Sequence, residues 1–143
     1  MKRVLIIMAL VVCQLSALAQ KDLYINELFE GKIVPPNKMV ETRVRGRSLS
    51  KYGLTFFRSV RYKSDSPKYD KVEKLLEQDI DRLPAQDCQR IKKRHTSLVY
   101  LQLPPVDNKQ RLLCYKDKDG EVLVIYTEGP KATLETLKKM YNE

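Results

Sequence analysis

Hydrophobic and polar residues alternate with a period of two over residues 40–45 and 54–63, a pattern typical of half-buried β-strands. Three more strands are predicted over 97–103, 110–116 and 121–128. The last has no polar interruption from Val122 to Tyr126, so we expect it to be covered on both faces or central in its sheet.

Helical spacing of apolar residues appears in three other stretches. A short helix is predicted over 23–30, a longer one begins at Ser66-Pro67 and ends before Pro84, and a final one follows Gly129-Pro130. One helical turn is expected over 48–52, and residues 85–94 form a polar stretch.

Turn residues separate these elements and indicate how the strands connect. Asp119-Gly120 predicts a tight hairpin turn, because glycine readily takes the positive φ angles that this turn needs. Pro104-Pro105 predicts a loop, because proline cannot continue a central strand ladder. The order of elements therefore predicts an α+β fold: an antiparallel sheet of about five strands with helices packed on one face.

The N-terminus has the three parts of a secretory signal peptide. Lys2 and Arg3 precede an apolar run over 4–12, and Ala17-Leu18-Ala19 matches the small-residue motif before a signal-peptide cleavage site. Cleavage is expected between Ala19 and Gln20, which leaves a single domain over 20–143. A lipid anchor on Cys13 is disfavoured, because Val12 stands where a small residue is required. No later segment reaches the roughly 18 apolar residues of a membrane span.

The charge of the chain narrows its expected partners. Its formal net charge is +9, and removal of Lys2 and Arg3 with the signal leaves +7. An exported protein does not normally meet nucleic acid, so the expected partners are an envelope protein or an anionic glycan or lipid surface. The same lysines and arginines also serve solubility, and the sequence leaves the oligomeric state open.

Five arginines cluster around the first two predicted strands: Arg43, Arg45, Arg47, Arg58 and Arg61. Pairing of these strands would bring several of them to one sheet face near Phe57 and Tyr52, where cations and aromatic rings could hold anionic sugars or head groups. Arg43, Arg45, Arg47, Arg61 and Phe57 are therefore the candidate ligand-binding residues.

Arg58 has the same strand parity as Phe56, Val60 and Tyr62, so it is predicted to point inward unless a bulge shifts the strand. A buried guanidinium without a partner costs several kcal/mol. Asp79 lies at the edge of the apolar stripe of the long helix. We expect an Arg58–Asp79 ion pair with a structural role, with an exposed Arg58 on the arginine face as the alternative.

Cys88 and Cys114 remain after removal of the signal, which carries Cys13. An even pair in an oxidising compartment is a candidate disulfide. Two buried free thiols that pack as small hydrophobic groups are the equal alternative.

The sequence contains no motif that indicates catalysis or a cofactor. His95 is the single histidine and lies in a basic loop, and a dyad with Cys88 is disfavoured. One histidine and two separated cysteines do not make a zinc site, and the segment 117–121 is better explained as a turn than as a calcium loop. We expect no metal, no cofactor and no enzymatic activity.

Two segments and the helix between them carry a resemblance. The run Lys51-Tyr52-Gly53-Leu54-Thr55-Phe56-Phe57-Arg58-Ser59-Val60, the charged helix after it and the run Lys118-Asp119-Gly120-Glu121-Val122-Leu123-Val124-Ile125 resemble small exported proteins of unknown function found in Bacteroidetes. The resemblance covers most of the mature chain. It implies an exported α+β domain and carries no activity.

These observations lead to an expected function. We expect a periplasmic or secreted, non-catalytic binding or protein-interaction domain of the cell envelope. The first alternative is a binder of anionic polysaccharide or lipid head groups through an arginine-rich sheet face, and the second is an enzyme of unrecognised type.

Overall fold

The computed structural model describes residues 22–137. The predicted signal peptide over 1–19 and the last residues of the predicted final helix, 138–143, therefore lie outside the described residues.

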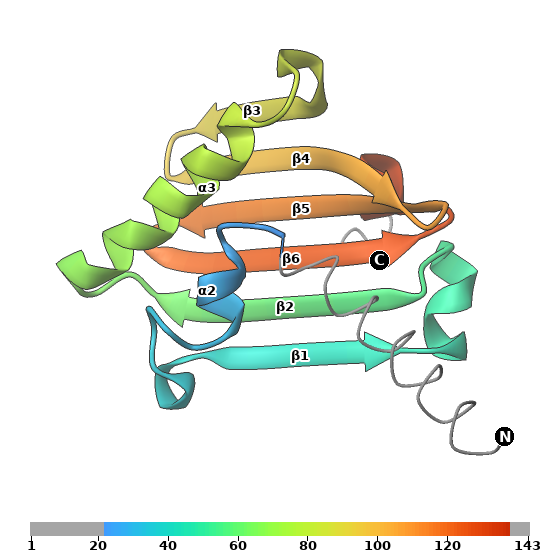
Figure 1. The fold of residues 1–143 in the computed structure, drawn as a ribbon. Helices are drawn as coiled ribbons and strands as arrows, with labels where there is room; N and C mark the ends of the chain where they lie inside the picture. The colour runs from blue at the N-terminus through green and yellow to red at the C-terminus, as the bar shows by residue number, and fades with distance from the viewer. Residues whose placement is uncertain (1–21, 138–143) are drawn as a thin grey trace, which may run out of the picture.

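The fold is built on one antiparallel sheet whose strands run in the order β1-β2-β6-β5-β4-β3 (Figure 1). The strands are β1 (Val40–Arg45), β2 (Phe56–Lys63), β3 (Cys88–Lys93), β4 (Thr96–Val106), β5 (Lys109–Lys118) and β6 (Glu121–Gly129). β6 lies between β2 and β5, which confirms that its unbroken apolar run belongs to a central strand.

The sheet has six strands, so the expectation of about five was too low. The additional strand is β3, which lies within the polar stretch 85–94, where no strand was predicted. β3 is an edge strand in which only Cys88 and Ile91 are half-buried while the other residues are exposed, so it has no alternating apolar signal.

The helices are few and mostly short. They are α2 (Asn26–Phe29) and α3 (Lys71–Asp81), with 3₁₀ turns η1 (Pro36–Lys38), η2 (Arg47–Tyr52), η3 (Pro67–Asp70) and η4 (Ala85–Asp87). The side chain of Ser66 accepts a hydrogen bond from the backbone N–H of Lys68, as expected for the residue that opens the longer helical segment. No helix among residues 22–137 is both long and apolar enough to cross a bilayer.

The main core lies between the sheet and helices α2 and α3, which cover the same face in Figure 1. Leu28 of α2 and Val72 and Leu76 of α3 pack there against strand residues such as Val124 and Leu101. We call this side of the sheet the helical face.

A second, smaller core occupies the back face of the sheet. Leu49 of η2 and Ala132 and Leu137 of the C-terminal segment cluster there with Leu112 and Ile125. Residues 134–137 are helical, so the expectation that helices pack on one face only was wrong in this respect. A strand as apolar as β6 needs cover on both sides, and this segment supplies it at one end of the back face.

Pro104 and Pro105 lie inside β4, where a loop was predicted. β3 pairs with β4 only as far as Leu101, so beyond that residue β4 is itself an edge strand. The register also shifts between Leu103 and Val106. Proline is tolerated at an edge and at a bulge, because neither position requires its missing N–H for the ladder.

Candidate functional site

The strand register divides the predicted arginine group between the two faces of the sheet. Arg43 pairs with Arg58 and Arg45 with Phe56, so these residues share the helical face. Arg61 pairs with Val40 and lies on the back face. Phe57 is also on the back face but is buried in the second core, and Arg47 lies in η2. The five candidate ligand-binding residues therefore do not form one surface.

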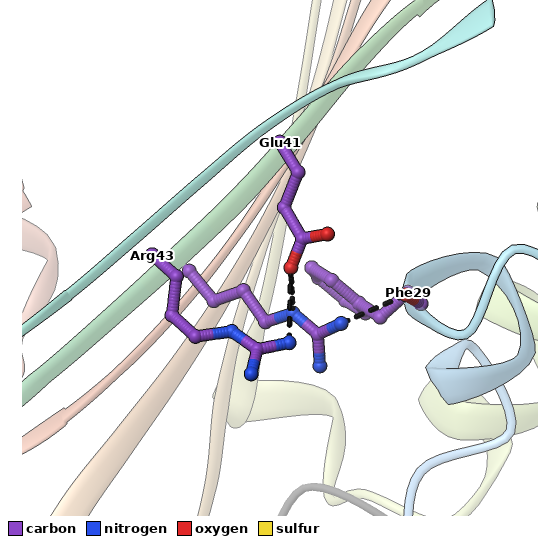
Figure 2. Close-up of polar contacts among 4 residues, drawn as sticks. Phe29, Glu41 and Arg43 are labelled. Atoms are coloured by element: carbon purple, nitrogen blue, oxygen red, sulfur yellow. Dashed lines mark hydrogen bonds and ion pairs between the residues drawn. The ribbon is translucent and has the colours of Figure 1, made fainter. Parts of the chain in front are cut away.

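On the helical face, Arg58 connects β2 to β1 and to α2. Its Nε donates to Glu41 at 2.8 Å and its Nη2 donates to the carbonyl of Phe29 at 2.8 Å, while the guanidinium lies over the Phe29 ring. Arg43 donates to the same Glu41 oxygen at 3.1 Å (Figure 2). Burial lowers the pKa of Arg58 and Glu41 opposes this shift, so the guanidinium stays charged.

The predicted Arg58–Asp79 ion pair is not formed. Asp79 is buried, and its two carboxylate oxygens accept hydrogen bonds from the backbone N–H groups of Tyr24 and Ile25 at 2.8 and 3.0 Å. These N–H groups have no partner within α2, and a carboxylate at a helix N-terminus satisfies them directly. Burial raises the pKa of Asp79, whereas the two hydrogen bonds act in the opposite direction.

A second buried polar group on the helical face was missed by the sequence reasoning. Arg111 and Glu128 pair across β5 and β6, and the Nε of Arg111 donates to the hydroxyl of Tyr126 at 2.9 Å. Burial raises the pKa of Glu128, while a hydrogen bond with Tyr126 lowers it. Arg111 shares strand parity with the buried Leu113, and that parity is the signal that could have indicated an inward arginine.

The half of the back face that lies outside the second core, as far as residues 22–137 show, carries a concentration of cations. We call it the basic face and define it by five residues: Arg61, Lys63, Lys93, Lys116 and Lys118. The register places Arg61, Leu123, Lys116, Leu98 and Ile91 in one row across the sheet. The next row contains Lys63, Glu121, Lys118, Thr96 and Lys93. Directly paired residues project from the same side of a sheet, so these side chains share one surface.

The charges of the basic face are only weakly compensated. Glu121 is the one carboxylate in the two rows, and it lies 3.9 Å from Arg61 with both side chains more than half exposed. An exposed pair of this kind contributes at most about 1 kcal/mol. The face therefore presents five cations against one carboxylate.

Two hollows adjoin this face, and Arg61 and Glu121 line both of them. One hollow of about 170 Å³ is formed by Arg61, Lys116, Lys118, Glu121 and Leu123. The other, of about 380 Å³, extends past Lys63 toward Lys38 and Val40. Arg61 is thus the only predicted site residue that the fold places on the basic face.

The four lysines of the basic face were not among the predicted site residues. Strand periodicity does place Lys116 and Lys118 on the same side of β5 as Cys114. It does not reveal that β6 separates β5 from β2, and this arrangement brings Arg61 near Lys116.

Cys88 and Cys114 are free thiols, so of the two equal alternatives the disulfide is not formed. Cys88 faces Leu101 and contributes to the main core, whereas Cys114 faces Tyr100 and belongs to the second core. The sheet lies between them, and their strands are two spacings apart, about 10 Å. Burial raises the pKa of Cys114 to about 12, which keeps this thiol protonated at neutral pH.

His95 and Cys88 lie at opposite ends of β3, which separates them by roughly 17 Å or more and rules out a Cys–His dyad. Nδ1 of His95 is 3.4 Å from exposed Asp119. Asp117 accepts a hydrogen bond from the Gly120 N–H within the β5–β6 turn, and Asp119 and Gly120 have φ angles of 53° and 85°. The segment 117–121 is therefore a hairpin turn, and residues 22–137 contain no cluster suited to a metal ion.

Comparison with known proteins places the chain in a family. No curated protein and no solved structure matches the chain. A match to a protein family extends over residues 12–141 and includes every strand of the sheet. The chain belongs to the family described as a family of unknown function, DUF6108.

Proposed function

We propose that this chain is an exported, non-catalytic binding domain that holds an anionic polymer on its basic face. The observation that carries the proposal is the two-row arrangement of five exposed or half-exposed cations with a single carboxylate among them. The proposal keeps the expected class of ligand but moves the site from the arginines of β1 to the opposite side of the sheet.

The composition of the rows favours an acidic polysaccharide. Arg61 and Lys116 are two strand spacings apart, about 10 Å, with the half-buried Leu123 between them. Leu98 and Ile91 continue this row beyond Lys116. Sugar rings combine apolar carbon faces with charged acid groups, and a surface on which cations alternate with aliphatic side chains suits both.

Few large apolar side chains are available for docking an apolar partner. Among the described residues, the exposed ones are Tyr24 and Val40, which belong to different parts of the fold. They form no continuous apolar patch of the kind that marks many protein interfaces. This distribution supports an anionic ligand over an apolar protein partner.

The test measures binding of the mature chain to immobilised polygalacturonate. The triple variant Arg61→Gln/Lys116→Gln/Lys118→Gln should bind at least about tenfold more weakly, because each lost charge removes a favourable Coulomb term. The matched control Arg45→Gln/Arg47→Gln/Lys51→Gln loses the same charge elsewhere and should retain most of the affinity. Binding of the wild type should fall steeply between 0.05 and about 1 M salt, as screening predicts.

Equal losses in the two triple variants would contradict a defined site and indicate attraction by net charge alone. Stronger binding to vesicles with anionic lipid than to the polysaccharide would replace the proposed ligand with a membrane surface. N-terminal sequencing of the protein from its native cell tests the exported location separately.

A further inference from the structure

β1 forms one edge of the sheet, and no other described strand pairs with its outer side. An edge strand presents unpaired backbone N–H and C=O groups that can accept another strand. β1 also carries Val40, whose side chain is 67% exposed. The edge is six residues long and contains no proline to block pairing.

We propose that β1 pairs antiparallel with β1 of a second copy of this chain, with Thr42 facing the partner's Thr42. In this register Glu41 faces the partner's Arg43, and Arg43 faces the partner's Glu41. Val40 faces the partner's Val44, which covers the exposed apolar side chain. Opposite charges and β-branched residues placed directly across from each other are favourable cross-strand pairs.

The charge pattern selects this register over its neighbours. A pairing centred on Arg43 would place Arg43 against the partner's Arg43, and one centred on Glu41 would place two carboxylates together. Like charges directly opposite each other are destabilising. A pairing centred on Val44 would place Arg43 against the partner's Arg45. Among pairings centred on residues 41–44, only the one centred on Thr42 opposes no like charges, with Arg45 facing the partner's Met39.

The other edge strand, β3, does not share this property. Its charged residues, Arg90, Lys92 and Lys93, are all cations, so a pairing of β3 with itself would oppose like charges. Charges of one sign are a common protection of edge strands against pairing. The contrast leaves β1 as the self-complementary edge and favours a closed two-fold dimer over an open chain of copies.

Contacts within one copy already hold Glu41 in position for this pairing. Arg58 and Arg43 both donate to its Oε1 (Figure 2), and none of the hydrogen bonds or ion pairs that Glu41 forms with described residues involves its Oε2. Arg58 is only 12% exposed and therefore anchors Glu41 from the inner side of the strand. Arg43 keeps a side-chain exposure of 53% and can reach across the edge.

A dimer of this kind joins the two sheets into one, because the two-fold axis runs perpendicular to them. The basic faces of both copies then point to the same side and offer one extended surface. The pairing itself is argued from β1 alone and does not rest on the proposed function.

Sedimentation equilibrium of the mature chain tests the dimer. We expect a reversible monomer–dimer equilibrium with a dissociation constant of at most about 1 mM. Arg43→Glu and, separately, Val40→Lys should raise the dimer dissociation constant at least about tenfold, by charge repulsion and by loss of the apolar pair. Gln89→Lys on the exposed edge of β3 is the matched control and should leave it unchanged.

Mixing two oppositely charged variants tests whether complementary charges restore the dimer. Arg43→Glu makes β1 acidic and Glu41→Lys makes it basic, so each variant should remain monomeric alone and the two should associate when mixed. A wild type that stays monomeric throughout, or an equal loss in the β3 control, would overturn the proposal. Circular dichroism of each variant confirms that the fold is kept.

Cross-linking tests the register. In a Cys88→Ser background, Thr42→Cys should form an intermolecular disulfide under mild oxidation, because directly opposed residues lie within the Cα range of a disulfide. Val44→Cys should cross-link much more slowly, since its own counterpart lies away from it in this register. Equal rates for the two variants would contradict the pairing centred on Thr42.

Discussion

At the scale of single residues, one buried and one half-buried charged side chain explain how a helix of four residues is held in place. Asp79 accepts hydrogen bonds at the N-terminal end of α2, and Arg58 donates to the carbonyl of Phe29 at its C-terminal end. Each charge lies at the helix end whose partial charge it complements. Isolated helices this short are not stable, so α2 depends on these tertiary contacts.

Replacement of Arg58 by Met should lower the free energy of unfolding by about 2 kcal/mol, because charged hydrogen bonds to Glu41 and Phe29 are lost. Urea denaturation measures this change. Arg61→Met on the exposed side of the same strand is the control and should change stability by less than about 0.5 kcal/mol. A double-mutant cycle with Glu41→Gln should show coupling, and strict additivity would argue against the Arg58–Glu41 contact.

Asp79 should make stability depend on pH. Its pKa is raised on folding by burial, so the folded state binds more protons than the unfolded state once the pH exceeds the unfolded value of about 4. The contribution of this carboxyl to the free energy of unfolding therefore falls as the pH rises through its folded pKa, and it is constant above that range.

The Asp79→Asn variant isolates this effect, since its amide does not titrate. The difference in unfolding free energy between wild type and variant, measured by urea denaturation from about pH 3 to pH 7, should change in favour of the variant as the pH rises. A difference that moves in the opposite direction would mean that the hydrogen bonds from Tyr24 and Ile25 outweigh burial.

At the scale of elements, the end of β6 depends on a glycine. Gly129 has a φ angle of 157°, and a Cβ at this position would lie 2.6 Å from the backbone of Gly53 and of Leu54. The same region contains the hydrogen bonds from Thr55 N–H to the Glu128 carbonyl and from Lys131 N–H to the Gly53 carbonyl. These contacts direct the chain from β6 to the second core.

Gly129→Ala should therefore be strongly destabilising, by about 3 kcal/mol or more, because backbone atoms must move to admit the methyl group. Gly46→Ala is the matched control. Gly46 also has a positive φ, of 100°, but a Cβ there meets no atom within 4 Å. Its cost should be limited to about 1 kcal/mol of backbone strain, and thermal unfolding compares the two variants.

Cys88 in β3 and Cys114 in β5 lie on opposite faces of the sheet, and this placement determines how each thiol reacts. In the folded mature protein, a thiol reagent should label the half-buried Cys88 slowly and leave the buried Cys114 unlabelled until denaturant is added. A reducing agent should not change the melting temperature. An intact mass that is lower by two hydrogens would reveal a disulfide and would contradict the strand register.

At the scale of the whole molecule, the sheet order decides which surface is available for binding. β6 follows β5 in a hairpin and then pairs with β2 on its other side, which brings the early and late parts of the chain together. One end of the back face is covered by η2 and the C-terminal segment. The other end carries the five cations of the basic face.

Export remains a prediction from the first residues of the sequence. The mature protein should begin at Gln20, because the Ala17-Leu18-Ala19 motif fits the requirement for small residues before the cleavage site. Intact-mass measurement of protein purified from its native cell decides this. A mass that includes Met1 would contradict the exported location and, with it, the choice of an extracellular polysaccharide.

The sequence by itself determined much of the local structure. Residues 40–45 were predicted to form a strand with the bounds that β1 has, and the Asp119-Gly120 turn and the helix that Ser66-Pro67 opens were also confirmed. The α+β class followed from the order of these elements. Such features depend on residues close together in the chain, through side-chain periodicity, capping and the φ preference of glycine.

Only the tertiary structure decided which residues meet. Strand parity predicted that Arg58 points inward. In the folded chain Arg58 donates to Glu41 and to the Phe29 carbonyl, whereas Asp79 accepts a hydrogen bond at the start of α2. The separation of Cys88 from Cys114 and the meeting of Arg61 with Lys116 likewise depend on the order of strands across the sheet. Periodicity fixes the side of a strand on which a residue lies, whereas the neighbouring strand is chosen by packing between distant parts of the chain.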